Sequence, residues 1–491
     1  MFGTAKAREF PKNFTWFNTN NPLSLEILRG HVIVLDFWTY CCINCMHMLP
    51  DLKWLENKYR GKPFVVIGVH SAKFDNEQNP ENIQEALDRY EIEHPIIIDE
   101  KMIIWRSYGV QGWPTIAVID PHGNVVYQQS GEGQREDLDD VIQVLLTREE
   151  ARGVLAKPLE IFRPKIKHQS ILRYPGKISF APEGNMFAVS DSNHNRILLI
   201  DLTGKIRQVI GGGEEGLVDG KFESARFFRP QGVLWHDSEI YVADTENHAL
   251  REVNLENKSV KTVAGTGKQG HWLEEGKGTS VMLSSPWDLA LKDERLFIAM
   301  AGTHQIWYYD VKEQEIKHYA GSGSENIIDG QLKKAQFAQP SGLSIDGKFL
   351  YVADSEVSGI RKIDLEKGVV ETVAGEGLFV FGHEDGELSN ARFQHPLGVN
   401  AVNGSIYVSD TYNNAIRVID AKKKTVSTLV GKPGIKTMCR IDDKECDTLG
   451  LYEPSDVKLY GNNLFIADTN NHLIRTFDLE KMVLKTFKIL Q

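Results

Sequence analysis

The second half of the chain repeats one segment six times, and this repeat limits the possible folds more than any other feature. Each copy begins with a proline, and successive prolines lie 54 to 58 residues apart: Pro175, Pro230, Pro286, Pro340, Pro396 and Pro454. Four short strand patterns without helical spacing follow each proline, which is typical of a propeller blade. One blade cannot bury both faces of its sheet alone, so the copies must stack and close into a ring. The sequence therefore predicts a six-bladed β-propeller over residues 171–491.

An aspartate ends the second strand pattern in five copies, and Met300 replaces it in the third. The five are Asp191, Asp244, Asp354, Asp410 and Asp468. At 244–251, 410–417 and 468–475 it begins an Asp-Thr-x-Asn-His/Asn run ending in arginine, which resembles the signature of the NHL repeat family. Such side chains can form binding sites, but a role repeated around a ring favours structure. We expect the aspartate to cap N–H groups of the tight turn and the arginine to pair with a neighbouring blade.

The first 150 residues alternate strand and helix patterns, which predicts an α/β domain over residues 1–150. Apolar, β-branched runs predict strands at 31–38, 64–69, 96–98, 115–119 and 125–128. Apolar residues at helical spacing predict helices at 44–59, 80–90 and 135–146. This order indicates a central sheet with helices on both faces. Residues 151–170 contain glycine, prolines and charges without a period, so we interpret them as a linker.

The segment Cys42-Ile-Asn-Cys45 lies where the first long strand gives way to a helix. Unpaired N–H groups and the helix dipole favour a thiolate at the helix start, which is the position of Cys42. Cys45 follows one helical turn later, within reach of a mixed disulfide on Cys42. A zinc site is the alternative use of Cys41, Cys42, Cys45 and His47. Structural zinc usually takes two separated ligand pairs, and no second pair lies nearby, so we predict a redox dithiol with no metal and no cofactor.

The residues around this dithiol resemble the thioredoxin family. Asp36-Phe-Trp38 precedes the cysteines, and Trp113-Pro114-Thr115 follows later; the resemblance covers about residues 13–148. It implies that Asp36 is a buried acid that moves the proton of the resolving cysteine. It also implies that Pro114 is cis and faces the dithiol, and that Trp38, Trp113 and Thr115 contact the client. The long segment between strands is similar to the branch of thiol–disulfide proteins with an inserted αβ unit.

Other cysteines and neighbours of the dithiol leave alternatives open. Ile43-Asn44 replaces the usual Gly-Pro of the family, so reduction and oxidation of the client both remain possible. Cys41 is a packing residue or a regulatory thiol, and we favour packing. We interpret His47 as an ordinary exposed side chain rather than one that tunes the dithiol. Cys439 and Cys446 either form a disulfide exchanged by the first domain or are two thiols of a surface loop.

Composition excludes some functions. The formal net charge of −11 argues against a general nucleic-acid binder, because phosphate binding needs a basic surface. The first hydrophobic stretch, Val32 to Phe37, is too short to span a bilayer, and no secretory signal precedes it, so we predict no membrane partner. Five cysteines, three of them clustered, do not form a secreted disulfide scaffold. We predict a cytoplasmic location.

The order of the two domains resembles a family in which a thioredoxin-like domain precedes an NHL propeller. Three functions follow. The first is a thiol–disulfide oxidoreductase whose propeller recruits a protein client, since propellers display broad faces made of loops. The second is an interaction scaffold in which the first domain is structural or senses redox state. The third is a propeller enzyme with a small molecule in the central channel. The residues favour the first, with Cys42 as nucleophile and Cys45 as resolving cysteine.

Overall fold

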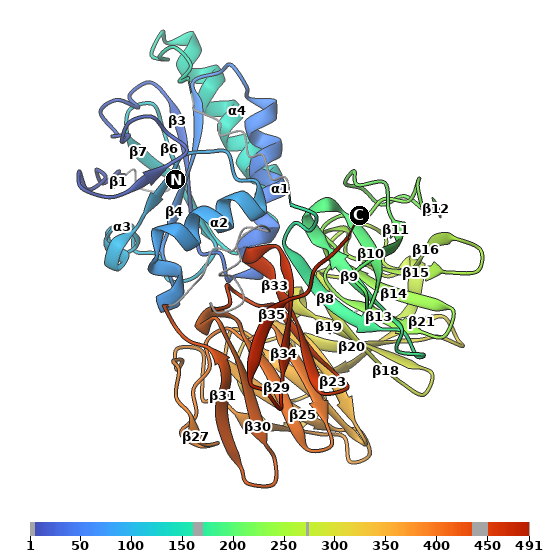
Figure 1. Cartoon of the computed structure of the whole chain (residues 1–491). Coiled ribbons are helices and arrows are strands. Elements are labelled where there is room, and N and C mark those ends of the chain that lie inside the picture. Colours follow the sequence, from blue (N-terminus) through green and yellow to red (C-terminus); the bar gives the residue numbers. More distant parts are fainter. Residues whose placement is uncertain (1–4, 161–169, 272–273, 435–449, 491) are drawn as a thin grey trace. The chain divides into compact units, whose positions relative to one another are not determined.

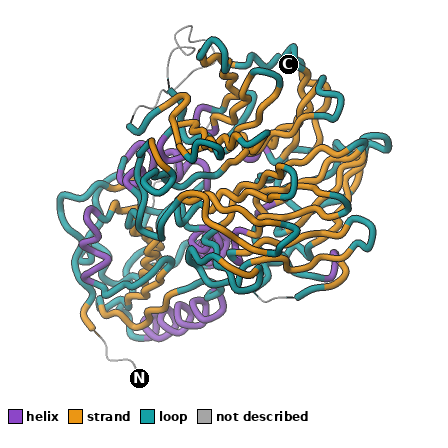
Figure 2. Tube along the Cα trace, turned by 90° about the horizontal axis from the view of Figure 1, so that it is seen from below, coloured by secondary structure: helices purple, strands orange, loops and turns teal. Residues whose placement is uncertain are grey.

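The structure is a computed structural model that describes residues 5–160, 170–271, 274–434 and 450–490 (Figure 1). It divides into two units, Met1–Lys167 and His168–Gln491. Part of the segment expected to be a linker packs on the first unit: Ala156 N–H donates to Gly30 O (3.1 Å), and Leu155 and Leu159 pack against its two cores. Among the described residues, α-helices occur only in the first unit, and the second is built of strands and single turns (Figure 2).

A seven-stranded sheet forms the centre of the first unit, in the order β1-β7-β6-β3-β4-β5-β2. The strands are β1 Ala5–Lys6, β2 Trp16–Phe17, β3 Val32–Trp38, β4 Phe64–His70, β5 Ile96–Ile98, β6 Thr115–Ile119 and β7 Asn124–Ser130. β3 is parallel to β4 and antiparallel to β6, and β4 is parallel to β5. The five longer strands confirm the expected ones. The two-residue edge strands β1 and β2 were not predicted, because two residues are too few for a hydrophobic period.

Helices cover both faces of this sheet, as the strand–helix order predicts. They are α1 Ile43–Lys58, α2 Pro80–Tyr90, α3 Ile103–Ser107 and α4 Arg135–Ala151, with the 3₁₀ turns η1 Asp75–Gln78 and η2 Glu100–Met102. Val32 and Val34 share one core with residues of α1 and α4, while Ile33, Leu35 and Phe37 share the other core with α3. Side chains alternate along a strand, so Asp36 lies on the face that α1 covers. Pro50 stands inside α1 without ending it.

Six antiparallel sheets form the second unit, one per repeat, as the repeat predicts. The first three blades are β8 Pro175–Phe180, β9 Met186–Asp191, β10 Arg196–Asp201 and β11 Ile206–Ile210; β13 Val233–His236, β14 Glu239–Asp244, β15 Ala249–Asn254 and β16 Ser259–Ala264; β18 Pro286–Lys292, β19 Arg295–Met300, β20 Gln305–Asp310 and β21 Glu315–Ala320. The last three are β23 Pro340–Asp346, β24 Phe349–Asp354, β25 Gly359–Asp364 and β26 Val369–Ala374; β28 Gly398–Val402, β29 Ser405–Asp410, β30 Ala415–Asp420 and β31 Thr425–Gly431; β32 Asp456–Tyr460, β33 Asn463–Asp468, β34 Leu473–Asp478 and β35 Val483–Thr486. Two-residue strands extend blades two to five at the outer edge: β12 Gly220–Lys221, β17 Gly276–Lys277, β22 Gly330–Gln331 and β27 Gly386–Glu387.

The repeated aspartates are structural, but their partners differ from those expected. Asp244 is fully buried and accepts from the backbone N–H of Phe228 (2.8 Å), in the loop that enters the same blade, and from the Asn247 side chain (2.8 Å) rather than the backbone of the tight turn. Arg251 pairs with this aspartate (2.7 Å) within the blade, not with a neighbouring blade. The same pairs recur as Arg361–Asp354, Arg417–Asp410 and Arg475–Asp468. In blade three, Met300 and Trp307 replace the pair, and both are buried.

Neighbouring blades are joined by one hydrogen bond that recurs six times. The residue after each tight turn accepts from a backbone N–H in the next blade, and the donors all have positive φ. The bonds are Arg229 N to Asn195, Ser285 N to His248, Gln339 N to His304, His395 N to Ser358, Glu453 N to Asn414 and Tyr174 N to His472. The last of these joins blade six to blade one and so closes the ring.

Residues close to the C-terminus complete this closure. Leu490 N–H donates to Gly204 O (2.7 Å) and Ile206 N–H donates to Leu490 O (3.2 Å), which ties residue 490 to the outer strand of blade one. On the N-terminal side of blade one, Leu159 packs in the first unit, and residues 161–164 lie outside the described ranges.

Candidate active site at the dithiol

Two cysteines stand at the start of α1 in unequal positions. Cys42 is the N-cap residue, with extended φ and ψ of −82° and 113°, and it is half-buried. Cys45 is 1% exposed. The backbone N–H of Cys45 donates to Cys42 Sγ at 3.3 Å, and both cysteines are thiols. An N–H group at a helix start that points at sulfur favours a negative charge there, so the outer sulfur is the better nucleophile and the inner one is shielded.

The inner thiol and Asp36 lie in a dry environment. Burial raises the pKa of Cys45 well above its usual value, and its hydrogen bond with Cys42 and the charge of Asp36 raise it further. Asp36 is 1% exposed, and burial raises its pKa from 3.8 to about 7. A carboxyl with a pKa near neutrality can both accept and release a proton, which is the property expected of the acid beside a resolving cysteine.

The peptide bond between Trp113 and Pro114 is cis, as the resemblance implies. Thr115, the next residue, pairs with Phe37 in the sheet, so Pro114 lies at the end of β3 from which the dithiol loop leaves. Trp113 is half-buried, donates from Nε1 to Ser71 O (2.9 Å), and packs 4.5 Å from Trp105 between ring centroids. Strand pairing thus brings the dithiol and the cis-proline turn to one edge of the sheet.

Two residues expected to contact a client are buried instead. Trp38 is 1% exposed and its ring packs edge-on against His70. Thr115 is also 1% exposed, and its hydroxyl donates to Gly112 O (2.7 Å) and lies 2.7 Å from Ser130 Oγ. Of the three side chains expected to contact a client, only that of Trp113 is thus partly exposed. Sequence position relative to a motif does not reveal that the side chains point inward.

A glutamate that the sequence analysis missed fixes the loop before the dithiol. Glu77 in η1 is fully buried and accepts from Thr39 Oγ1 (2.7 Å), Cys41 N (2.8 Å) and Phe74 N (3.0 Å). Cys41 is 3% exposed, in agreement with a packing role. The insertion therefore positions the residues just before Cys42. A lone glutamate in a polar stretch carries no periodic signal that could have identified it.

His47 is buried, not exposed as expected. Its Nδ1 lies 2.5 Å from Glu132 Oε2, which comes from the turn between β7 and α4. The interpretation as an ordinary exposed side chain was wrong because Glu132, 85 residues further along the chain, covers this part of the helix. Nothing in the local sequence around His47 indicates that contact.

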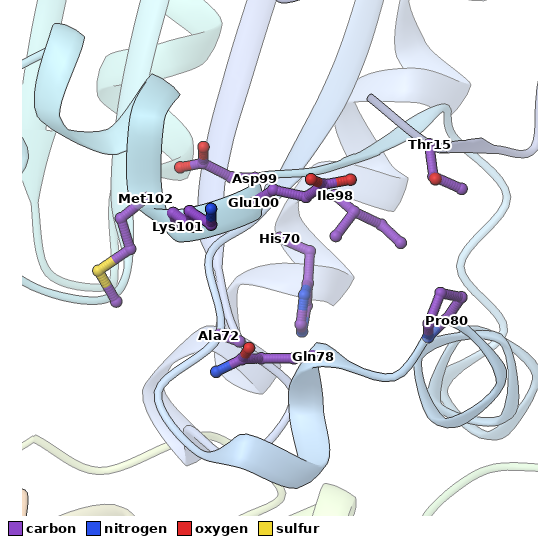
Figure 3. A pocket seen from close by; sticks show the side chains of 10 residues that line it. All are labelled: Thr15, His70, Ala72, Gln78, Pro80, Ile98, Asp99, Glu100, Lys101 and Met102. Carbon is purple, nitrogen blue, oxygen red and sulfur yellow. The ribbon is translucent and has the colours of Figure 1, made fainter. Parts of the chain in front are cut away.

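A cavity of about 510 Å³ opens beside the site, at the carboxyl ends of β4 and β5 (Figure 3). Its lining includes His70, Gln78, Asp99, Lys101 and Met102. Burial lowers the pKa of His70 to about 3, so its ring stays neutral. Neither cysteine of the dithiol lines the cavity, which is therefore separate from the thiol chemistry.

A lysine crosses the axis of the propeller. Lys177, at the start of the inner strand of blade one, is fully buried and donates to Ser455 O in blade six (3.0 Å) and to Leu397 O in blade five. Asp288 of blade three lies 3.9 Å from its Nζ. Among the described residues no group of three or more His, Cys, Asp or Glu could hold a metal ion. These contacts give the lysine a structural role that joins blades one, five and six.

Known proteins match both units. A family model described as thioredoxin-like matches residues 30–125, and one described as LVIVD repeat matches 339–358 and 453–474. SUPPRESSOR OF QUENCHING 1, chloroplastic, of Arabidopsis thaliana is 46% identical over 497 residues, 96% of this chain and 46% of that protein. NHL repeat-containing protein 2 of Bos taurus is 40% identical over 520 residues, 98% of this chain and 71% of that protein. Thiol-disulfide oxidoreductase ResA of Halalkalibacterium halodurans is 27% identical over 143 residues, 29% of this chain and 78% of that protein.

The fold and the matches define a class of protein in which a thioredoxin-like domain precedes a six-bladed NHL-type propeller. Within this class, the chain belongs to the NHL repeat-containing protein 2 family. It spans about half of the length of the Arabidopsis relative, 46%, and 71% of the bovine one. In the described ranges, none of the helices combines the length and apolar character needed to span a bilayer.

Proposed function

We propose that the first unit exchanges thiols and disulfides with a protein client through Cys42 and Cys45. The observation that carries this proposal is the unequal setting of the two sulfurs. Cys42 is half-buried at the helix start and accepts an N–H, whereas Cys45 is 1% exposed beneath it. An accessible nucleophile with a shielded partner one turn away is what a two-step exchange needs.

The reduction of a client disulfide then proceeds in two balanced steps. The Cys42 thiolate attacks one client sulfur, forms a mixed disulfide and releases the other client sulfur as a thiolate. Cys45 gives its proton to Asp36 and attacks Cys42 Sγ, which closes the Cys42–Cys45 disulfide and releases the second client thiolate. Two electrons pass from the dithiol to the client, and both client thiolates take up protons. An external dithiol restores the enzyme.

Client binding is proposed for two surfaces. The cis-proline turn with Trp113 lies at the same sheet edge as the dithiol, so an extended client segment can bind beside it. The propeller is proposed to bind the client protein through its loops, as rigid scaffolds carry recognition loops. We also propose a cytoplasmic location for this protein. The name of the Arabidopsis relative, in contrast, describes that protein as chloroplastic.

Insulin reduction by dithiothreitol tests the proposal. Wild-type protein should accelerate the precipitation of the insulin B chain, and Cys42→Ser should remove the acceleration while circular dichroism remains unchanged. The control is Cys41→Ser, which should keep most of the activity because Cys41 is buried beside Glu77. An inactive wild-type protein, together with interaction partners that still bind a Cys42→Ser, Cys45→Ser double variant, would favour the scaffold function instead.

Identification of the client needs a trapped intermediate. In Cys45→Ser the mixed disulfide on Cys42 cannot be resolved, so the client should remain attached and be released by reducing agent. Cys42→Ser, which lacks the nucleophile, is the matched control and should capture no disulfide-linked protein.

A further inference from the structure

Glycine at position 68 leaves room for a buried group of polar side chains above β4. Gly68 pairs with Asp36 in the parallel β3–β4 ladder, so the two residues lie side by side on the face that α1 covers. A Cβ atom on Gly68 would lie 2.3 Å from Ile96 Cδ1, 2.9 Å from Trp38 Nε1 and 3.4 Å from His94 Nε2. The His94 ring, from the loop between α2 and β5, therefore lies close to the residue beside Asp36, together with Ile96 and Trp38.

The polar atoms of this group have no hydrogen-bond partner in the described protein. They are both carboxyl oxygens of Asp36, Trp38 Nε1 and His94 Nε2. Asp36 is 1% exposed and His94 is 4% exposed. Buried polar atoms are nearly always bonded in proteins, and the exceptions often mark chemistry. Here the unsatisfied acid is the one proposed to take the proton of Cys45.

The other nitrogen of His94 points towards the surface. His94 Nδ1 lies 3.4 Å from Glu56 Oε2, and the Glu56 side chain, in the last turns of α1, is 14% exposed. The His94 ring thus lies between a buried carboxyl and a carboxylate that reaches solvent. The neighbouring His70 cannot take this part, because its pKa of about 3 keeps it neutral, and an indole N–H such as that of Trp38 does not titrate.

We propose that His94 is a positioning residue for Asp36 and the relay through which the proton of Cys45 leaves the site. The inference rests on the proposed thiol–disulfide function. In the resolving step the proton moves from Cys45 Sγ to Asp36. His94 Nε2 then takes it up, His94 Nδ1 releases its own proton towards Glu56 and water, and the ring returns to its neutral form. No electrons move through the ring, and nothing besides the proton is transferred.

The electrostatics agree with this geometry. A positive charge on His94 lowers the pKa of Asp36, against the larger rise caused by burial. Glu56 faces His94 from α1, and Cys45 faces Asp36 from the same helix. Removal of the His94 ring should therefore make Asp36 a carboxyl that ionises only at higher pH, so that it can no longer take a proton near neutrality.

The test separates the two exchange steps with 5,5′-dithiobis(2-nitrobenzoate). Cys42 releases the first coloured thiolate, and attack by Cys45 on the mixed disulfide releases the second. In His94→Gln the first phase should be unchanged. The second phase should be about tenfold slower at pH 7, and its pH profile should move to higher pH. Glu56→Gln should produce a smaller change in the same direction, since water can replace an acceptor that is partly in contact with solvent.

His122→Gln is the matched control. His122 also lies beside a glutamate, 3.1 Å from Glu149, but in the turn at the opposite end of the sheet, so both phases should match the wild type. The proposal is overturned if the second phase of His94→Gln follows the wild type at every pH, or if both phases slow equally. Should His94→Gln fail to fold, His94→Asn and Glu56→Gln supply the same comparison.

A second readout distinguishes this inference from the proposed function. Carbon NMR of the Asp36 carboxyl follows its titration whether or not the protein turns over. An upward move of that titration in His94→Gln supports the Asp36–His94 link even if the wild type shows no second phase. An unchanged Asp36 titration overturns the link even if the wild type is active.

Discussion

Buried carboxylates occur in both units, and the comparison between Asp36 and Asp410 shows two opposite uses of them. Asp410 accepts from Gln394 N, Asn413 Nδ2 and Arg417 Nη1, each at 2.8 Å. Asp36 is as deeply buried, yet neither of its oxygens has a hydrogen-bond partner in the described protein. Burial raises the pKa of both. A raised pKa alone therefore does not distinguish the carboxyl proposed to move a proton from a structural one, whereas the hydrogen-bond donors around the two differ.

The largest loss of stability should come from breaking a buried ion pair whose carboxylate is fully hydrogen-bonded. Arg417 is fully buried and bonds Asp410, Asp385 Oδ1 (2.6 Å) and Glu384 O (2.8 Å). Arg417→Ala leaves the aspartate buried and unpaired, so urea unfolding should show a loss of about 3–5 kcal/mol. Arg392→Ala, which removes a pair with the exposed Glu376, should cost about 0–1 kcal/mol. Equal losses in the two variants would contradict the distinction.

Removal of the Asp36 carboxyl, which has no hydrogen-bond donor among the described residues, should instead increase the stability of the protein at high pH. The folded-state pKa of Asp36 is about 7 against a usual 3.8, so folding favours the protonated form. Its contribution to stability is complete below pH 3.8 and is lost as the pH rises through 7. Asp36→Asn should therefore match the wild type near pH 4 and be up to about 4 kcal/mol more stable at pH 8. Urea unfolding at both pH values measures this, and a variant less stable at pH 8 would refute it.

Blade three has apolar residues in place of the buried ion pair, and this difference between blades tests how much the pair contributes to stability. Blade three holds Met300 and Trp307 where blade five holds Asp410 and Arg417, and the Met300 sulfur accepts from Ser284 N (3.3 Å). Well-packed apolar residues can replace a buried ion pair at little cost. The double variant Asp410→Met, Arg417→Trp should thus lose less stability than Arg417→Ala alone, about 1–2 kcal/mol. Thermal unfolding of both variants measures this difference. A double variant that is less stable than Arg417→Ala would show that apolar residues cannot replace the ion pair in blade five.

The smallest effect concerns a single bond between blades. His472→Ala removes the acceptor of Tyr174 N (3.1 Å) and should cost about 1 kcal/mol, since that N–H stays buried. His236→Ala, at an exposed position of blade two, should leave the unfolding midpoint unchanged. A loss in both variants would show that the ring is not held by this bond.

The sequence predicted those parts of the fold and of the candidate site that show as a repeated spacing or as a known motif. Six prolines at regular spacing predicted six blades, and Cys42-Ile-Asn-Cys45 with Trp113-Pro114 predicted the thioredoxin-like sheet and its cis-proline. Neither a spacing nor a motif shows in which direction a side chain points or which distant residue it contacts. Trp38 and Thr115 are buried, and the propeller arginines pair with aspartates of their own blade. His47 contacts Glu132, which lies 85 residues further along the chain. Cys439 and Cys446 lie outside the described residues, so their two interpretations stay predictions.

The tie between residue 490 and blade one has a consequence for synthesis of the protein. Blade one begins at Pro175, so a ribosome must add more than 300 further residues before Leu490 can bond Gly204 and Ile206. Through that interval the outer edge of the first blade lacks its last partner, while the first unit, which ends at Lys167, can already fold. Nascent chains stalled within the last blade should therefore be sensitive to protease in the propeller and resistant in the first unit.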